Sequence, residues 1–190
     1  MSIISTFKLL KKFFRDKNMD FKHIRFGLAF ATLAILLGGL MGLGFGCCED
    51  SFKDKFKKDA TTALKEKYNG DQNKADKVSA KSWVYMKRAH LHSQTMGVIS
   101  IVLSLIAAGL AFPPLLQTGI SLMSGLGSIG YGLFWFLAGL LAPGMGSTGI
   151  AKETVGFVAQ VSAGSFFIAV VGLFCMLGYK VFIQKISFNK

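Results

Sequence analysis

Four long apolar runs dominate the hydropathy pattern of this chain. They cover residues 26–48, 93–112, 117–142 and 154–179, and they contain no Asp, Glu, Lys, Arg or His. Each reaches the roughly 20 residues that a helix needs to cross about 30 Å of hydrocarbon. Because backbone polar groups in a bilayer must be satisfied within the segment, we predict four transmembrane helices.

The links between the later runs are short and contain helix-breaking residues. Phe112-Pro113-Pro114 is expected to stop the second helix, and Pro143-Gly144 the third. Ser147 or Thr148 can then cap the fourth helix. Short links favour antiparallel neighbours, so the predicted fold is an all-α integral membrane protein, a four-transmembrane-helix up-down bundle.

Residues 49–92 differ from the runs around them because they are rich in Lys, Asp and Glu. In the first half of this segment, apolar side chains recur every four residues, as on one face of a helix: Phe52, Phe56, Ala60, Leu64 and Tyr68. Asn69-Gly70 predicts a break, and a second stretch carries Ala75, Val78, Trp83 and Met86. We predict an extramembrane amphipathic helical hairpin at the membrane surface, whose stripe covers lipid headgroups, the ends of the bundle or a partner.

Composition supports a membrane protein and assigns its charge to the bilayer surface. The chain of 190 residues is 52% hydrophobic, with a mean hydropathy of +0.47 and a formal net charge of +12. The charge lies outside the apolar runs, so anionic lipid headgroups are its expected partner. No nucleic-acid-binding motif stands out in the basic segments, and nucleic acid is not an expected partner.

The basic tract ahead of the first run predicts the orientation. Residues 1–25 form a basic N-terminal segment, and residues 180–190 form a basic C-terminal tail. Since basic residues beside the first helix usually stay inside, both termini are expected in the cytoplasm of a bacterial inner membrane. The first apolar run is longer than a signal core, which favours an uncleaved anchor, although LGFGC leaves lipidation of Cys47 as an alternative.

Small residues recur along one side of each run, where they would let helices approach closely. The positions singled out for helix packing are Gly38, Gly42 and Gly46 in the first run, Ser128 and Gly132 in the third, and Gly172 in the fourth. Such faces fit packing inside the bundle, or an interface with another subunit or a second copy. Gln160 is the strongest polar group within a run, and we expect it to form a hydrogen-bonded link between helices.

His90 and His92 are the candidate metal ligands. On a helix, residues two apart point away from each other, so each would pair with a methionine four residues away: His90 with Met86, and His92 with Met96. Such a set would suit copper or haem b. The competing interpretation makes them interfacial residues with an apolar body and a polar tip, and no cofactor is then expected.

Three functions remain open on this basis. Motifs for soluble catalysis are absent, so an enzyme has no support. The favoured hypothesis is a non-catalytic multi-pass protein, a structural or accessory subunit of a membrane assembly or homo-oligomer. The alternatives are a haem or copper protein of electron transfer or metal handling that uses His90 and His92, and a small transporter of an uncharged or apolar cargo, since no ionisable residue lies within a run.

Overall fold

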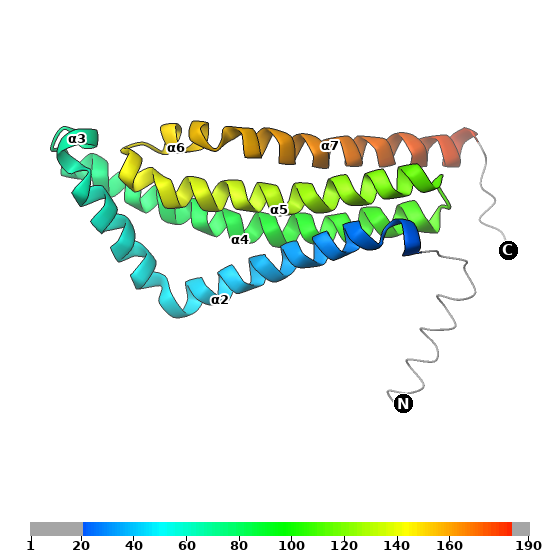
Figure 1. Cartoon of the computed structure of the whole chain (residues 1–190), viewed down its shortest axis with the longest axis horizontal. Coiled ribbons are helices and arrows are strands. Elements are labelled where there is room, and N and C mark those ends of the chain that lie inside the picture. The colour runs from blue at the N-terminus through cyan, green and yellow to red at the C-terminus, as the bar shows by residue number, and fades with distance from the viewer. Residues whose placement is uncertain (1–20, 184–190) are drawn as a thin grey trace, which may run out of the picture.

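The computed structural model describes residues 21–183, and that part of the chain is entirely helical. Four long helices pack as a bundle, which confirms the predicted all-α architecture (Figure 1). The elements are η1 (Phe21–His23), α2 (Arg25–Thr62), α3 (Leu64–Tyr68), α4 (Gln72–Gly109), α5 (Pro114–Met145), α6 (Thr148–Thr154), α7 (Gly156–Gly178) and the π-helical turn η2 (Tyr179–Ile183). Most of the two basic segments predicted at 1–25 and 180–190 lies outside the described residues.

Four of these helices are long and apolar enough to cross a membrane, which indicates an integral membrane protein. They are α2, α4, α5 and the continuous run of α7 and η2. With 38 residues each, α2 and α4 are roughly 57 Å long at 1.5 Å per residue. That is almost twice the roughly 30 Å of the hydrocarbon layer, so both helices also contain an extramembrane part.

The central helix of the bundle is α5. It packs against α2 and α4, and α7 packs on it as well, whereas α7 makes few contacts with any other long helix. Figure 1 shows α7 along one side of the bundle, α5 and α4 in the middle, and α2 along the other side. Three helices therefore share an interior, while the fourth is attached through one face.

The structure does not show the separate hairpin predicted between the first two membrane helices. Instead, α4 runs unbroken from Gln72, and α2 continues to Thr62 across a kink at Cys48, where φ is −135° and ψ is 28°. The chain reverses at Asn69 and Gly70, whose φ angles of 54° and 79° are left-handed. The reason is that charge alone does not end a helix, and residues 49–68 and 71–92 contain no Pro or Gly.

The apolar stripe of residues 52–68 packs against the N-terminal half of α4. Phe56, Ala60 and Tyr68 are almost fully buried, and they pack in clusters with Met86 and Ala75. The apolar stripe therefore packs against another helix of the same chain. The charged sides of both helices remain outward.

An aromatic cluster fills the angle that the kink of α2 makes with α4 and α5. The ring of Phe45 lies edge-on to those of Trp83 and Phe52, with centroid distances of 5.1 and 5.5 Å. Phe56 and Phe136 complete the cluster. These large rings support the bend, in which α2 leaves α5 and returns to α4 (Figure 1).

The predicted end of the third helix, at residue 142 before Pro143-Gly144, is wrong by three residues. Pro143 is buried inside α5, which continues to Met145, and Gly146 ends the helix with a φ of 76°. This end of α5 is held by a tertiary contact, because Tyr68 donates a hydrogen bond of 2.7 Å to the carbonyl oxygen of Pro143. Ser147 does act as a cap, but it caps the short helix α6 rather than the fourth long helix.

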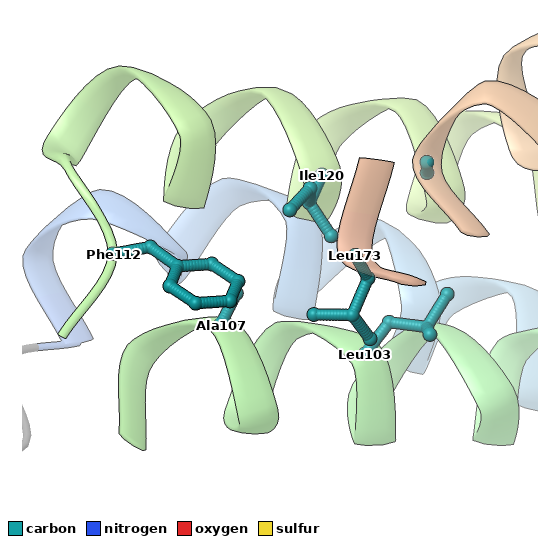
Figure 2. Close-up of a cluster of buried hydrophobic side chains, with 6 residues drawn as sticks. Leu103, Ala107, Phe112, Ile120 and Leu173 are labelled. Atoms are coloured by element: carbon teal, nitrogen blue, oxygen red, sulfur yellow. The ribbon is translucent and has the colours of Figure 1, made fainter. Parts of the chain in front are cut away.

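The opposite end of the bundle is held by a second apolar cluster. Leu103 and Ala107 of α4, Phe112 of the link, Ile120 of α5 and Leu173 of α7 pack together there (Figure 2). Lys180 lies over this cluster and donates a hydrogen bond of 2.7 Å to the carbonyl oxygen of Leu110. A cation is favourable at this position because the free carbonyl groups of a helix C-terminus carry partial negative charge.

Candidate functional site

A seam of buried serine hydroxyls runs between α4 and α5. The Oγ atoms of Ser100 and Ser128 lie 2.8 Å apart, and Ser104 Oγ lies 2.8 Å from Ser121 Oγ. All four side chains are fully buried. Where lipid is the solvent, such hydrogen bonds hold helices together, at about 0.6 kcal/mol each on average.

The seam also reaches α2. Ser121 donates to the carbonyl oxygen of Ile24 at 3.1 Å, and Thr118 donates to that of His23 at 3.0 Å. The start of α2 is therefore tied to α5 by two hydroxyl side chains that donate to the backbone carbonyl oxygens of His23 and Ile24. Hydroxyl groups thus join three helices at one end of the bundle.

Glycines of α5 face three different helices. A Cβ atom built on Gly125 would lie 2.7 Å from the Gly27 carbonyl oxygen of α2, and one on Gly127 would lie 2.7 Å from the Ser162 carbonyl oxygen of α7. A Cβ on Gly132 would collide with Ser93 of α4. Each contact requires a residue without a side chain, which explains why the central helix contains so many glycines.

The glycines predicted to pack in the first run behave differently from one another. Gly38 lies against the backbone of α4, where an added Cβ would be 3.1 Å from the His90 carbonyl oxygen, and Gly42 lies against the His90 ring. An added Cβ on Gly46 would meet nothing within 4 Å. Gly38 and Gly42 therefore pack against α4, whereas Gly46, which lies next to the kink, faces away from it.

The other predicted packing positions lie in α5 and α7. Ser128 belongs to the serine seam, and Gly132 contacts α4. A Cβ on Gly172 would reach only an ordinary contact of 4.0 Å with Ile120. Close packing between α5 and α7 instead occurs at Gly127 and Gly130, both of which face Ser162.

His90 points toward α2. Its Nδ1 lies 2.6 Å from the Gly38 carbonyl oxygen, and because a carbonyl oxygen only accepts, Nδ1 carries the proton. The ring packs edge-on to Phe45 at 6.4 Å. Met86, its proposed partner, is fully buried with Phe45 and Phe56 in the aromatic cluster.

His92 points toward α5. Its ring stacks on Trp135 with a centroid distance of 6.0 Å and contacts Tyr131 at 5.0 Å. The guanidinium carbon of Arg88 lies 4.8 Å from the centre of the same Trp135 ring. This grouping of a cation with aromatic rings is typical of a membrane–water boundary.

The structure therefore separates the two histidines, as expected for residues two apart on a helix. One contacts α2 and the other contacts α5, and within residues 21–183 no three His, Cys, Asp or Glu side chains are grouped to hold a metal ion. Cys47 and Cys48 are exposed free thiols at the kink. Binding of copper or haem by His90, His92, Met86 and Met96 stays a prediction.

Several of the closest contacts between helices were not predicted from the sequence. Gly27, Gly97, Gly127 and Gly130 all face a neighbouring helix, and Lys180 caps α4. The signal that could have revealed Gly127 and Gly130 is the presence of glycine on more than one side of the third run. Only a helix with neighbours on several sides needs that pattern.

Comparisons of the chain with known protein families, with curated proteins and with solved structures found no match.

Proposed function

We propose that the protein is a non-catalytic structural or accessory subunit that packs into a larger membrane assembly or homo-oligomer through the outer face of α7. The observation that supports this most directly is Gln160. Its side chain is exposed on α7 and has no hydrogen-bond partner among residues 21–183. The predicted hydrogen-bonded link through this residue is thus absent within the described part of the chain.

The surroundings of Gln160 fit a helix–helix contact. Gly156 and Gly164 lie one turn to either side on the same face, and a Cβ added to either would meet nothing within 4 Å. Phe167 and Val171 extend that face, and they are 67% and 41% exposed. The side of α7 that packs on α5 is the opposite one, with Ser162, Ala169 and Leu173.

An exposed amide within the candidate span Gly156–Ile183 can be satisfied by a protein neighbour. It has donors and an acceptor that hydrocarbon cannot satisfy, and glutamine side chains do bridge membrane helices. A second copy is the simplest neighbour, because an amide can both donate to and accept from its own image across a two-fold axis. The four apolar runs add support, because they contain no Asp, Glu, Lys, Arg or His, and ionisable residues at that depth usually mark proton or ion paths.

The test is the oligomeric state of the full chain in lipid nanodiscs, measured by single-molecule photobleaching. We expect dimers for the parent chain and largely monomers for Gln160→Leu, which removes the amide while it retains apolar bulk. Phe174→Leu is the matched control, because Phe174 is 75% exposed on α7 and carries no polar group. A parent chain that is monomeric at every protein-to-lipid ratio would contradict self-assembly.

The orientation belongs to the same proposal. We infer that both termini are cytoplasmic, that anionic headgroups contact the basic segments, and that the arms of α2 and α4 beyond the bilayer face the other side. A reporter placed at Asn69-Gly70, the tip of the arms, is then exported, whereas one fused after Lys190 is active in the cytoplasm. The reverse pattern would overturn the orientation but not the assembly.

A further inference from the structure

A groove opens between α2 and α5 where the two helices diverge toward the kink. It has a volume of about 320 Å³ and is walled by Leu37 and Met41 of α2 and by Ile129, Leu133 and Phe136 of α5. Ser93 of α4 and Gly132 of α5, which are both buried, form its floor. Its walls are therefore apolar, and one hydroxyl group lies at its base.

That hydroxyl group differs from those of the other buried serines. Ser93 is 3% exposed, and its side chain has no hydrogen-bond partner among residues 21–183. Every other buried serine in this range has one, and most donate to the carbonyl oxygen four residues earlier, as Ser104 and Ser128 do. The hydroxyl group opens into the groove, and in apolar surroundings a hydrogen-bond partner from outside the chain would be favourable.

The position of this hydroxyl depends on Gly132. A Cβ atom at that residue would collide with Ser93 Oγ. The missing side chain thus lets the hydroxyl lie against the backbone of α5 at the base of the groove. Alanine at residue 132 would occupy the same space.

The mouth of the groove opens on the outer surface of the bundle. Leu37 and Leu133, one on each wall, are 40% and 46% exposed. Both belong to the apolar parts of candidate membrane-spanning helices, so the surface around the mouth contacts hydrocarbon when the helices span the bilayer. A ligand would enter from the lipid phase and would need no charge.

We propose that this groove binds a neutral, lipid-soluble molecule that carries one hydrogen-bonding oxygen on an otherwise apolar body. Ligand sites are commonly 300–1,000 Å³ in volume, mostly apolar, and fix orientation with a few polar groups. Here Ser93 supplies the polar group and the walls supply apolar contact. The site involves α2, α4 and α5 and not the outer face of α7, so it goes beyond the proposed assembly and does not depend on it.

Benzophenone is a suitable probe because it has one carbonyl oxygen between two apolar rings and reacts with nearby C–H bonds under ultraviolet light. The full chain in phosphatidylcholine–phosphatidylglycerol nanodiscs is irradiated with increasing benzophenone, and the labelled residues are mapped by mass spectrometry. We expect saturable labelling at Met41 on the groove wall, and weaker, non-saturating labelling at Met176 of α7. Fluorenone in excess should suppress the Met41 signal, whereas fluorene, which lacks the oxygen, should suppress it far less.

Variants separate a specific site from general partition into lipid. Ser93→Ala should raise the benzophenone concentration for half-labelling of Met41 by roughly tenfold, the loss expected for one hydrogen bond. Ser100→Ala is its control, since that hydroxyl is in the serine seam and does not line the groove. Leu133→Trp should fill the groove and abolish saturable labelling, while Leu126→Trp, at a residue 49% exposed on the same helix, should not.

Three results would overturn the proposal. They are labelling of Met41 that does not saturate, equal competition by fluorene and fluorenone, and an unchanged half-labelling concentration in Ser93→Ala. A monomeric protein that still shows saturable, Ser93-dependent labelling would contradict the assembly through α7 and support the groove, so the two proposals fail separately.

Discussion

α5 and α7 are equally free of charge but occupy very different places in the bundle. Thirteen residues of α5 are buried, and they face α2, α4 and α7, whereas α7 buries three. Apolar composition therefore says only that each helix can enter a membrane. How many helices surround it depends on how its small residues are distributed around the helix axis.

The glycines of the two helices illustrate the difference. Gly125, Gly127 and Gly132 of α5 each lie within contact distance of another helix, while Gly156 and Gly164 of α7 face open space. A glycine that excludes a side chain from a tight contact stabilises the fold, and one on an open face does not. The open glycines of α7 are consequently available to a neighbour outside the chain.

The largest expected effect comes from adding a side chain to the central helix. Gly125→Leu should lower the free energy of unfolding by about 3 kcal/mol or prevent folding, because the new Cβ meets the Gly27 backbone of α2. Gly164→Leu should change it by less than about 0.5 kcal/mol. The measurement is thermal unfolding of both variants in detergent, and equal losses would break the distinction between the helices.

Neighbouring residues of α7 provide the next comparison. Leu173 is 6% exposed within the cluster of Figure 2, and Phe174 is 75% exposed. Leu173→Ala should reduce the free energy of unfolding by about 2–3 kcal/mol because it leaves a cavity, whereas Phe174→Ala should have little effect. If Phe174→Ala were the more damaging change in monomeric protein, the orientation of α7 on α5 would be wrong.

α2 should give an intermediate result. Gly42→Leu is expected to cost about 1–2 kcal/mol, because its side chain meets the ring of His90, which can move, rather than backbone. Leu36 is 57% exposed, so Leu36→Ala should cost less. Chemical denaturation of the two variants in mixed micelles provides the comparison, and indistinguishable midpoints would count against close packing at this face.

The smallest expected effect concerns Tyr68, whose hydroxyl group contacts the C-terminal end of α5. Tyr68→Phe should cost about 1 kcal/mol at neutral pH, through loss of the hydrogen bond to Pro143. Burial raises the pKa of Tyr68, so the folded state favours the neutral phenol. That preference is fully present below the unfolded pKa of about 10 and is lost as pH rises through the folded value.

The pH dependence distinguishes Tyr68 from a simple packing residue. Above pH 10 the parent chain should lose stability relative to Tyr68→Phe, so the gap between their melting temperatures should narrow. A gap that stays constant from pH 7 to 11 would mean that the Tyr68 hydroxyl is not buried against α5.

The long helices of this fold could be predicted from the sequence, because uncharged runs of some 20 residues have one solution in a bilayer. The chain reversal at Asn69-Gly70 was equally local, since both residues adopt left-handed conformations that few others tolerate. The amphipathic stripe that includes Phe56 was also visible. Its partner was not, because a periodic pattern identifies the buried side of a helix without identifying what covers it.

The candidate sites were harder to predict, for the same physical reason. The pairing of His90 with Gly38 and of His92 with Trp135 depends on which helices lie to either side of α4. Ser93 resembles every other small polar residue in the sequence, and only the divergence of α2 from α5 leaves its hydroxyl at the base of a groove. Side-chain chemistry and helix periodicity are local properties of the sequence. The neighbours of a helix and the grooves between helices depend on how segments distant in sequence pack together, so only the tertiary structure decides them.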